Sequence, residues 1–200
     1  MKTGVLGGTF NPPHKGHLAA ADAVRQALGL ERVLFIPTNL PPHKQLPEGS
    51  ATTAQRCDMV RLMTGPYPWA EFCDVEIRRG GASYTVDTLR ALHESGEDDL
   101  TLIMGTDMLL SFDRCWRAPD EIVRLAGLAA IARGTEDFPA LETKAKQLRE
   151  TLGARVTLVN CPVLPISSTD VRQQGTFEEL TPPEVAAYIR QNRLYQKVFG

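Results

Sequence analysis

The amino-acid sequence predicts an α/β fold in which helices cover both faces of a doubly wound parallel sheet. Short apolar runs alternate along the chain with longer stretches of helical periodicity, a pattern typical of βαβ units. Loop-like segments follow directly on two of the apolar runs, where open α/β sheets carry their functional loops. The 200 residues suit one domain, which we expect to span residues 1–200 and to end in a small helical part.

Each predicted strand is a short apolar run, and the stretches between these runs leave room for crossover helices. The predicted strands are Thr3–Leu6, Arg32–Ile36, Ala70–Asp74, Leu100–Met104, Leu128–Ala132 and Arg155–Val159.

The predicted helices are defined by apolar side chains at three- and four-residue spacing and by residues that suit helix ends. Gly29 and Gly153 are expected to be C-caps. Thr181 and Glu184 are expected to form a capping box, with proline at the first helical position. The predicted helices are His17–Leu28, Thr52–Met63, Tyr84–Glu94, Pro139–Leu152 and a last one from this box to about Asn192.

Three segments fit neither pattern and are expected to be loops. They hold many of the prolines, glycines and basic residues: Thr38–Ser50, Arg78–Ser83 and Ser111–Pro119. No repeat and no linker long enough to separate two domains is visible.

Bulk composition excludes several classes of function. The hydrophobic fraction of 42% and the charged fraction of 23% are ordinary for a soluble globular protein. A net charge of −2 argues against sequence-independent nucleic-acid binding, which needs a basic excess. No apolar run reaches the ~18 residues that would indicate a membrane span, and the N-terminus does not resemble a signal peptide. The four cysteines are widely spaced, which favours reduced thiols and a cytoplasmic protein.

The segment after the first predicted strand is the strongest functional signal. Gly7 and Gly8 are expected to let the backbone turn tightly and approach a ligand. His14, Gly16 and His17 follow at the start of a helix, where backbone N–H groups favour anions. Two imidazoles three residues apart could grip nucleotide phosphates. Taken separately, the same fragments could be a simple turn, a helix cap or part of a metal site.

The eleven-residue string Gly7–His17 resembles the H-x-G-H signature of the nucleotidyltransferase superfamily, and the chain is similar to bacterial nicotinate-nucleotide adenylyltransferases. Asn11 stands where that family usually has aspartate, so the loop lacks one negative charge. The resemblance extends over nearly the whole chain through Pro41-Pro42-His43-Lys44, Ser83–Leu89, Gly105–Leu109, Trp116 with Pro119, Ile166–Arg172, Tyr188-Ile189 and Leu194-Tyr195.

The resemblance implies a Rossmann-like fold, ATP and nicotinate mononucleotide as substrates, and nicotinate adenine dinucleotide and pyrophosphate as products. It implies catalytic roles for His14, His17 and Arg172. The ATP site that it implies consists of Gly7, Gly8, Thr9, Phe10, Gly105, Asp107, Arg133, Ile166, Ser167 and Ser168. The acceptor site that it implies consists of Asn39, His43, Lys44, Thr85 and Trp116.

Several of these residues have a structural interpretation beside the functional one. The hydroxyls of Ser167 and Ser168 could cap a helix or, with Arg172, donate to phosphates. Asp107 could be an N-terminal cap or bind the ribose hydroxyls. Trp116 could be a core residue or stack on a pyridinium ring.

The reaction needs no protein nucleophile, because the acceptor phosphate is already anionic above its second pKa of about 6. Catalysis then depends on alignment and on neutralising the phosphates. Mg²⁺ is expected to bind mainly through ATP phosphates and water, without a protein metal site.

Several alternatives stay open at this point. They are an adenylyltransferase acting on nicotinamide mononucleotide or phosphopantetheine, a cytidylyltransferase, a non-catalytic nucleotide-binding module, and a metal-binding protein that uses His14, His17 and His43. The sequence leaves open whether the chain forms a homo-oligomer.

Overall fold

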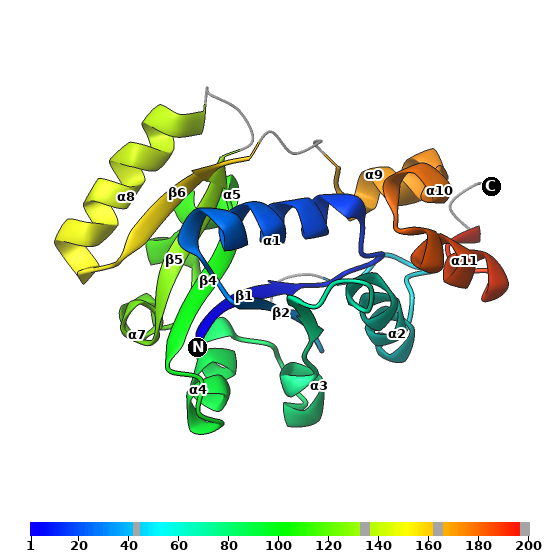
Figure 1. Cartoon of the computed structure of the whole chain (residues 1–200), viewed down its shortest axis with the longest axis horizontal. Helices are drawn as coiled ribbons and strands as arrows, with labels where there is room; N and C mark the ends of the chain where they lie inside the picture. The colour runs from blue at the N-terminus through cyan, green and yellow to red at the C-terminus, as the bar shows by residue number, and fades with distance from the viewer. Residues whose placement is uncertain (42–44, 133–136, 162–165, 197–200) are drawn as a thin grey trace.

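The computed structural model describes residues 1–41, 45–132, 137–161 and 166–196. Within these residues one six-stranded sheet has the order β3-β2-β1-β4-β5-β6, and every neighbouring pair is parallel (Figure 1). The strands are β1 (Lys2–Gly8), β2 (Arg32–Pro37), β3 (Ala70–Phe72), β4 (Asp99–Gly105), β5 (Ala126–Ala132) and β6 (Val156–Asn160).

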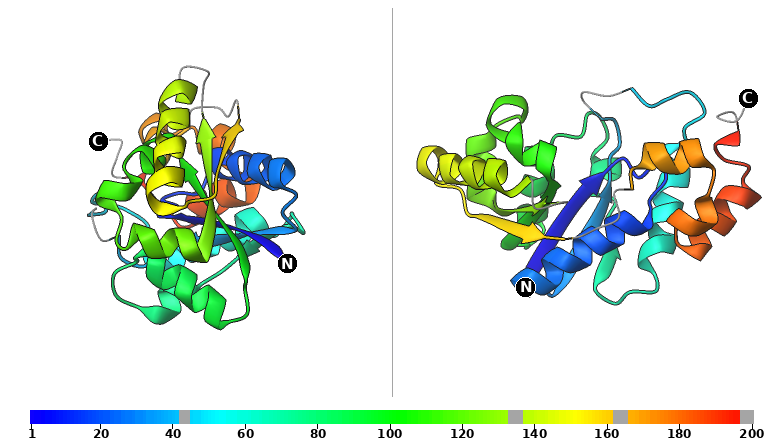
Figure 2. Two further views of the ribbon diagram at one scale, coloured as in Figure 1. Left: turned by 90° about the vertical axis from the view of Figure 1, so that its left-hand side faces the viewer. Right: turned by 90° about the horizontal axis from the view of Figure 1, so that it is seen from above.

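Helices cover both faces of this sheet, and α1 and α4 lie on opposite sides of it (Figures 1 and 2). The helices are α1 (Lys15–Leu28), α2 (Thr53–Thr64), α3 (Val75–Arg79), α4 (Thr85–Glu94), α5 (Thr106–Leu110), α6 (Phe112–Cys115), α7 (Pro119–Leu125), α8 (Phe138–Leu152), α9 (Ser168–Gln174), α10 (Phe177–Leu180) and α11 (Pro183–Gln191). The last three, orange to red, gather beside the carboxyl end of β1.

Two hydrophobic cores follow from the alternation of side chains along the strands. Leu34 and Leu102 pack with α4, α7 and α8 on one face, whereas their neighbours Phe35 and Ile103 pack with α1, α2 and α11 on the other. A strand buried on both faces needs apolar residues at every position, which is why the strands read as continuous apolar runs. The prediction of a doubly wound parallel sheet is therefore confirmed.

The predicted helices that have several turns are present, but five shorter ones were not predicted. Helices α3, α5, α6 and α7 lie in or beside segments expected to be loops or strand, and α10 lies just before the predicted last helix. The predicted capping box at Thr181 is wrong: α11 begins after Pro182, and the Thr181 hydroxyl donates to the Phe177 carbonyl at 2.6 Å. A proline does occupy the first helical position, but it is Pro183 and not Pro182, the residue that follows the predicted cap.

The strand order reverses between β1 and β4. The chain leaves β1 toward β2 and β3, then returns to place β4 on the other side of β1. Such a switch point opens a crevice at the carboxyl ends of the two strands, which here are Gly8 and Gly105. A ligand site is expected at this edge.

Across the described ranges, the structure contains no helix with the length and apolar character that crossing a membrane requires.

Candidate functional site

The first loop leaves β1 later than the sequence suggested. Gly7 and Gly8 were predicted to form the turn, but both belong to β1 and pair with Ile36 and Pro37. The backbone turns instead at Phe10, whose φ is 49°. A Cβ on Gly8 would lie 3.3 Å from the Phe10 ring, so this glycine lets the ring pack under the strand end.

The rings of His14 and His17 contact each other in a tilted arrangement at the start of α1. Their ring centroids lie 3.7 Å apart with an interplanar angle of 33°. The backbone N–H of His14 donates to Nδ1 of His17 at 3.1 Å. Because a neutral imidazole carries one proton, this bond fixes the proton of neutral His17 on Nε2. Nε2–H is then the donor that His17 can offer to a ligand.

Desolvation, and next to it repulsion from His14, lower the pKa of His17 well below its usual range. We therefore expect the His17 ring of the ligand-free protein to stay neutral at pH values where an exposed histidine, with a pKa of about 6.5, is already half protonated. Imidazole ¹⁵N chemical shifts recorded during an acid titration would measure this. A histidine in an unstructured peptide, titrated under the same conditions, serves as the reference. Parallel titration of His17 and this reference would contradict the assignment.

Gly16 is required by the packing of the histidine pair. A Cβ on residue 16 would lie 3.0 Å from Nδ1 and 3.1 Å from Cε1 of His14. These contacts are tighter than ordinary van der Waals contact, so a larger residue must displace the His14 ring.

Replacement of Gly16 by alanine is expected to reduce kcat by about 10-fold or more, since small misplacements of catalytic groups are costly. Gly127→Ala is the matched control, because Gly127 lies at the amino end of β5 and a Cβ there would meet only ordinary contacts of 3.8 Å or more. Steady-state kinetics of both variants check the prediction, and equal activities would contradict it.

Asn11 joins the first loop to segments that are distant in the sequence. The Asn11 amide donates to Ser50 Oγ at 2.8 Å and accepts from the Ala51 N–H at 3.2 Å and the Tyr195 hydroxyl at 2.9 Å. Its side chain is only 2% exposed. Asn11 therefore acts as a buried connector, and its neutral amide both donates and accepts within the loop.

Arg172, which was predicted to donate to the phosphates, contacts the first loop in this structure. Its guanidinium donates to the Asn11 carbonyl and to Thr169 Oγ1, the latter at 3.2 Å. The side chain is buried. In this arrangement Arg172 fixes the first loop against α9.

A cavity of about 300 Å³ opens at the switch point between β1 and β4. It brings together the first loop, the end of β4 and the start of α9, which are far apart in the sequence. The residues that line it are Leu6, Gly7, His14, Gly16, His17, Ala20, Ile103, Met104, Gly105, Met108, Ile131, Ile166, Ser167 and Ser168. Five predicted ATP-site residues thus share one cavity with both histidines: Gly7, Gly105, Ile166, Ser167 and Ser168.

The serines at the start of α9 have structural roles within this cavity wall. Ser167 caps the helix, because its hydroxyl accepts from the Asp170 N–H at 3.1 Å. Ser168 Oγ donates to the Pro12 carbonyl at 2.8 Å and so joins α9 to the first loop. The capping interpretation of Ser167 is confirmed, and both side chains still line the cavity.

The other predicted ATP residues that the structure describes are not part of the cavity wall. Thr9 and Phe10 follow the end of β1, and the Phe10 ring contacts His17 at a centroid distance of 4.8 Å. Asp107 is an exposed residue in the first turn of α5, the helix that begins directly after Gly105. Arg133 lies outside the described residues.

Asn39, the first of the predicted acceptor residues, follows the end of β2. Asn39 is joined to the segment before α4: its N–H donates to Ser83 Oγ and its amide donates to the Gly81 carbonyl, both at 3.0 Å. Thr85 follows as the first residue of α4. His43 and Lys44 lie outside the described residues.

Trp116 is half-buried and contacts Phe112 at a ring-centroid distance of 5.4 Å, so the core interpretation holds for part of its surface. The next residue, Arg117, lies with its guanidinium carbon 4.6 Å from the centre of the Tyr84 ring. The loop that carries Trp116 therefore adjoins the start of α4 and Thr85. Sequence reasoning overlooked Arg117, although its place beside Trp116 was visible.

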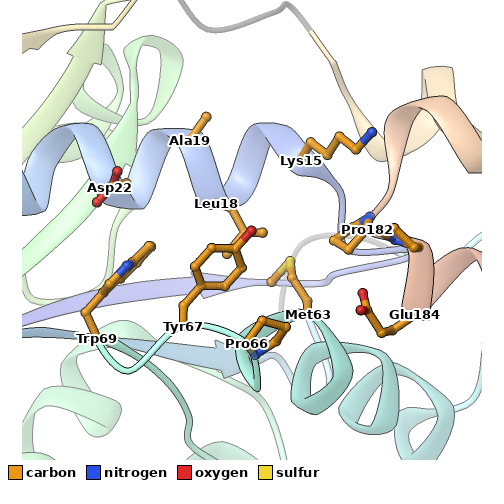
Figure 3. A pocket seen from close by; sticks show the side chains of 11 residues that line it. Lys15, Leu18, Ala19, Asp22, Met63, Pro66, Tyr67, Trp69, Pro182 and Glu184 are labelled. Carbon is orange, nitrogen blue, oxygen red and sulfur yellow. The ribbon is translucent and has the colours of Figure 1, made fainter.

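A second, larger cavity of about 450 Å³ lies on another side of α1 (Figure 3). Leu18, Met63 and Tyr67 surround it, with Lys15 and Glu184 at one end. Its wall is mostly apolar and its charged residues have mixed signs, so it lacks the features that would hold a polyphosphate. The cavity beside His14 and His17 is the better candidate.

No group of three histidine, cysteine, aspartate or glutamate side chains among the described residues could hold a metal ion.

The comparisons agree with this geometry. The cytidylyltransferase-like family matches residues 5–174. A protein of Roseiflexus castenholzii named "Probable nicotinate-nucleotide adenylyltransferase" is 43% identical over 202 residues, covering 98% of each chain. One of the same name from Symbiobacterium thermophilum is 39% identical over 201 residues, covering 97% of this chain and 95% of its own.

A solved structure shares the fold across almost the whole molecule. Plasmodium falciparum nicotinic acid mononucleotide adenylyltransferase, complexed with NaAD, superposes with a TM-score of 0.77 at 18% identity and covers 98% of both chains.

Proposed function

Since this chain belongs to the cytidylyltransferase-like family and, within it, to the nicotinate-nucleotide adenylyltransferases, we propose that its histidine-lined cavity transfers the adenylyl group of ATP to nicotinate mononucleotide. A phosphate oxygen of the mononucleotide forms a bond to the α-phosphorus of ATP. The bond from that phosphorus to the oxygen bridging to the β-phosphate breaks. Nicotinate adenine dinucleotide and pyrophosphate leave.

The observation that carries this proposal is the fixed donor of His17 in the cavity wall. Its Nδ1 accepts from the loop backbone, so the Nε2–H of the neutral ring is free of that bond and available to ATP. A donor held in place before the reaction stabilises charge on the leaving pyrophosphate without reorganisation. His14, whose ring contacts the His17 ring, is proposed to bind the same triphosphate.

The rest of ATP is proposed to lie across the strand ends. Gly7, the residue before the end of β1, and Gly105, the last residue of β4, are proposed to offer close backbone approach, and Asp107 is the proposed partner of the ribose hydroxyls. The backbone around Gly8, Thr9 and Phe10 shapes the loop, and Ile166, Ser167 and Ser168 form the opposite wall. Arg133 remains a proposed ATP contact.

The acceptor is proposed to bind between Asn39, Thr85 and the loop that carries Trp116. The Trp116 indole, only half-buried, retains surface that could stack on the pyridinium ring. His43 and Lys44 are proposed to contact its phosphate. Arg172 is proposed to act in catalysis by holding the first loop in place.

Mg²⁺ is proposed as the cofactor and would neutralise phosphate charge when bound. The described residues hold no cluster of metal ligands, so the ion would be bound through ATP phosphates and water rather than in a protein cage. The protein residues supply alignment and hydrogen-bond donors, and no side chain has to act as a nucleophile. We further propose that residues 1–200 form one catalytic domain that works in the cytoplasm.

Pyrophosphate release tests the activity. The purified chain would be given ATP with nicotinate mononucleotide, nicotinamide mononucleotide or phosphopantetheine in separate reactions. The proposal expects rapid release with nicotinate mononucleotide and slower release with the other two. Preference for another acceptor would correct the substrate, and no release with any of them would favour a nucleotide-binding module.

A further inference from the structure

Arg56 is a buried cation that the mechanism above does not use. It lies in the first turn of α2, its side chain is 0% exposed, and desolvation by burial lowers its pKa. None of the ion pairs formed among the described residues includes it. A buried guanidinium without a carboxylate is costly and persists only where other groups satisfy it.

The two Nη atoms of Arg56 donate to backbone carbonyls of the two substrate loops, whereas its buried Nε has no hydrogen-bond partner among the described residues. Nη1 donates to the Thr9 carbonyl at 2.7 Å, in the first loop. Nη2 donates to the Asn39 carbonyl at 3.4 Å, beyond β2. The Thr53 hydroxyl accepts from the same Nη2 at 3.2 Å and helps to orient the guanidinium group. One planar side chain thus bridges two loops that come from different strands.

The bridge continues from Asn39 to the start of α4. Asn39 donates to Ser83 Oγ and to the Gly81 carbonyl, and the Ser83 N–H donates to the Leu40 carbonyl at 2.9 Å. Thr85 follows two residues later. A continuous set of hydrogen bonds therefore runs from the turn beside His14 and His17 to the segment proposed to bind the acceptor.

We infer that Arg56 is a positioning residue that couples the ATP loop to the acceptor loop, so that ordering of the first loop by ATP also orders residues 81–85. The inference rests on the proposed function, because it takes the first loop as the ATP site. Arginine is needed because its fork reaches two carbonyls at once, whereas a lysine ammonium is a point charge on a flexible stem. Arg56 touches neither substrate in this arrangement.

Amide hydrogen exchange tests the coupling, with the non-hydrolysable analogue α,β-methylene-ATP as the probe. In the wild-type protein the analogue is expected to slow exchange in residues 7–17 and in residues 81–85. In Arg56→Lys the first loop should still be protected, while the protection factor gained at residues 81–85 should fall by about fivefold or more. A purely structural role would leave the ligand-induced change at residues 81–85 intact.

Two further variants make the result decisive. Arg61→Lys is the matched control, because Arg61 lies on the same helix but is exposed and pairs only with Asp58 among the ion pairs of the described residues. Thr53→Val removes the hydroxyl that orients Nη2 and keeps the guanidinium, so it should show a smaller loss of protection. It also replaces Arg56→Lys as the test if the lysine variant does not fold.

Full protection of residues 81–85 in the folded Arg56→Lys protein, or in Thr53→Val where the lysine variant does not fold, would overturn the coupling. The same holds if the analogue protects residues 7–17 of the wild-type protein but not residues 81–85. Absence of any protection of residues 7–17 in the wild type would overturn both the ATP site and the coupling. If the exchange result holds but no acceptor releases pyrophosphate, the proposed reaction fails and the coupling stands.

Discussion

Replacement of His17 by alanine is expected to lower kcat by about 10²- to 10³-fold, the usual cost of removing one preorganised donor to a developing charge. The dissociation constant for ATP should change much less. The reason is that Nε2–H of His17 is proposed to strengthen its hydrogen bond as pyrophosphate leaves, so most of its contribution appears in the transition state. Rapid-quench measurement of single-turnover adenylyl transfer, with direct titration of ATP binding, separates the two quantities.

The variant His17→Asn separates catalysis from the structure of the helix start. An asparagine oxygen can replace Nδ1 as the acceptor for the His14 N–H, a bond of 3.1 Å in this structure, but it offers no donor at the position of Nε2. We expect this variant to melt near the wild-type temperature and to share the low kcat of His17→Ala. Normal turnover in either variant would exclude the transition-state role. His93→Ala, at a distant position where Nε2 faces the Leu125 carbonyl, is the control for nonspecific effects.

The fold could be predicted because its strands are buried on both faces. Short continuous apolar runs such as Leu128–Ala132 are typical of strands that are buried on both faces of a sheet. The long amphipathic stretches between these runs indicate the crossover helices. The short helices α3 and α6 escaped prediction because helices of five and four residues have too few turns to show a periodicity. What the sequence patterns missed is therefore confined to the connections.

The candidate site could be predicted where its residues are contiguous. His14, Gly16 and His17 act within a single turn, and the clash of a Cβ on residue 16 with the His14 ring explains why that spacing carries a glycine. The role of Gly8 was misread, because it depends on the position of the Phe10 ring and not on a turn at the glycine pair.

Contacts between distant segments could not be predicted at all. Arg56 meets the Thr9 carbonyl across 47 residues of sequence, and Tyr195 meets Asn11 across 184. No pattern in one sequence indicates which buried arginine lies under which loop. The contact of Arg172 with the first loop was missed for the same reason, because the Asn11 carbonyl that it binds is 161 residues away.

Replacement of Arg172 by methionine should therefore affect both stability and catalysis. Methionine fills similar space but leaves the buried Asn11 carbonyl without the donor that Arg172 provides, a loss of about 1–3 kcal/mol in the free energy of unfolding. The released loop should then misplace His14 and His17, and kcat should fall by about 10²-fold. Urea unfolding and steady-state kinetics measure the two effects, and Arg190→Met, which removes an exposed pair with Glu178, is the matched control.

An Arg172 that contacted only the phosphates would give a different result. The free energy of unfolding of the ligand-free protein would be unchanged, and the loss of stability would appear only with ATP bound. If the ligand-free variant loses stability and kcat also falls, the result indicates that Arg172 acts in catalysis by positioning the first loop.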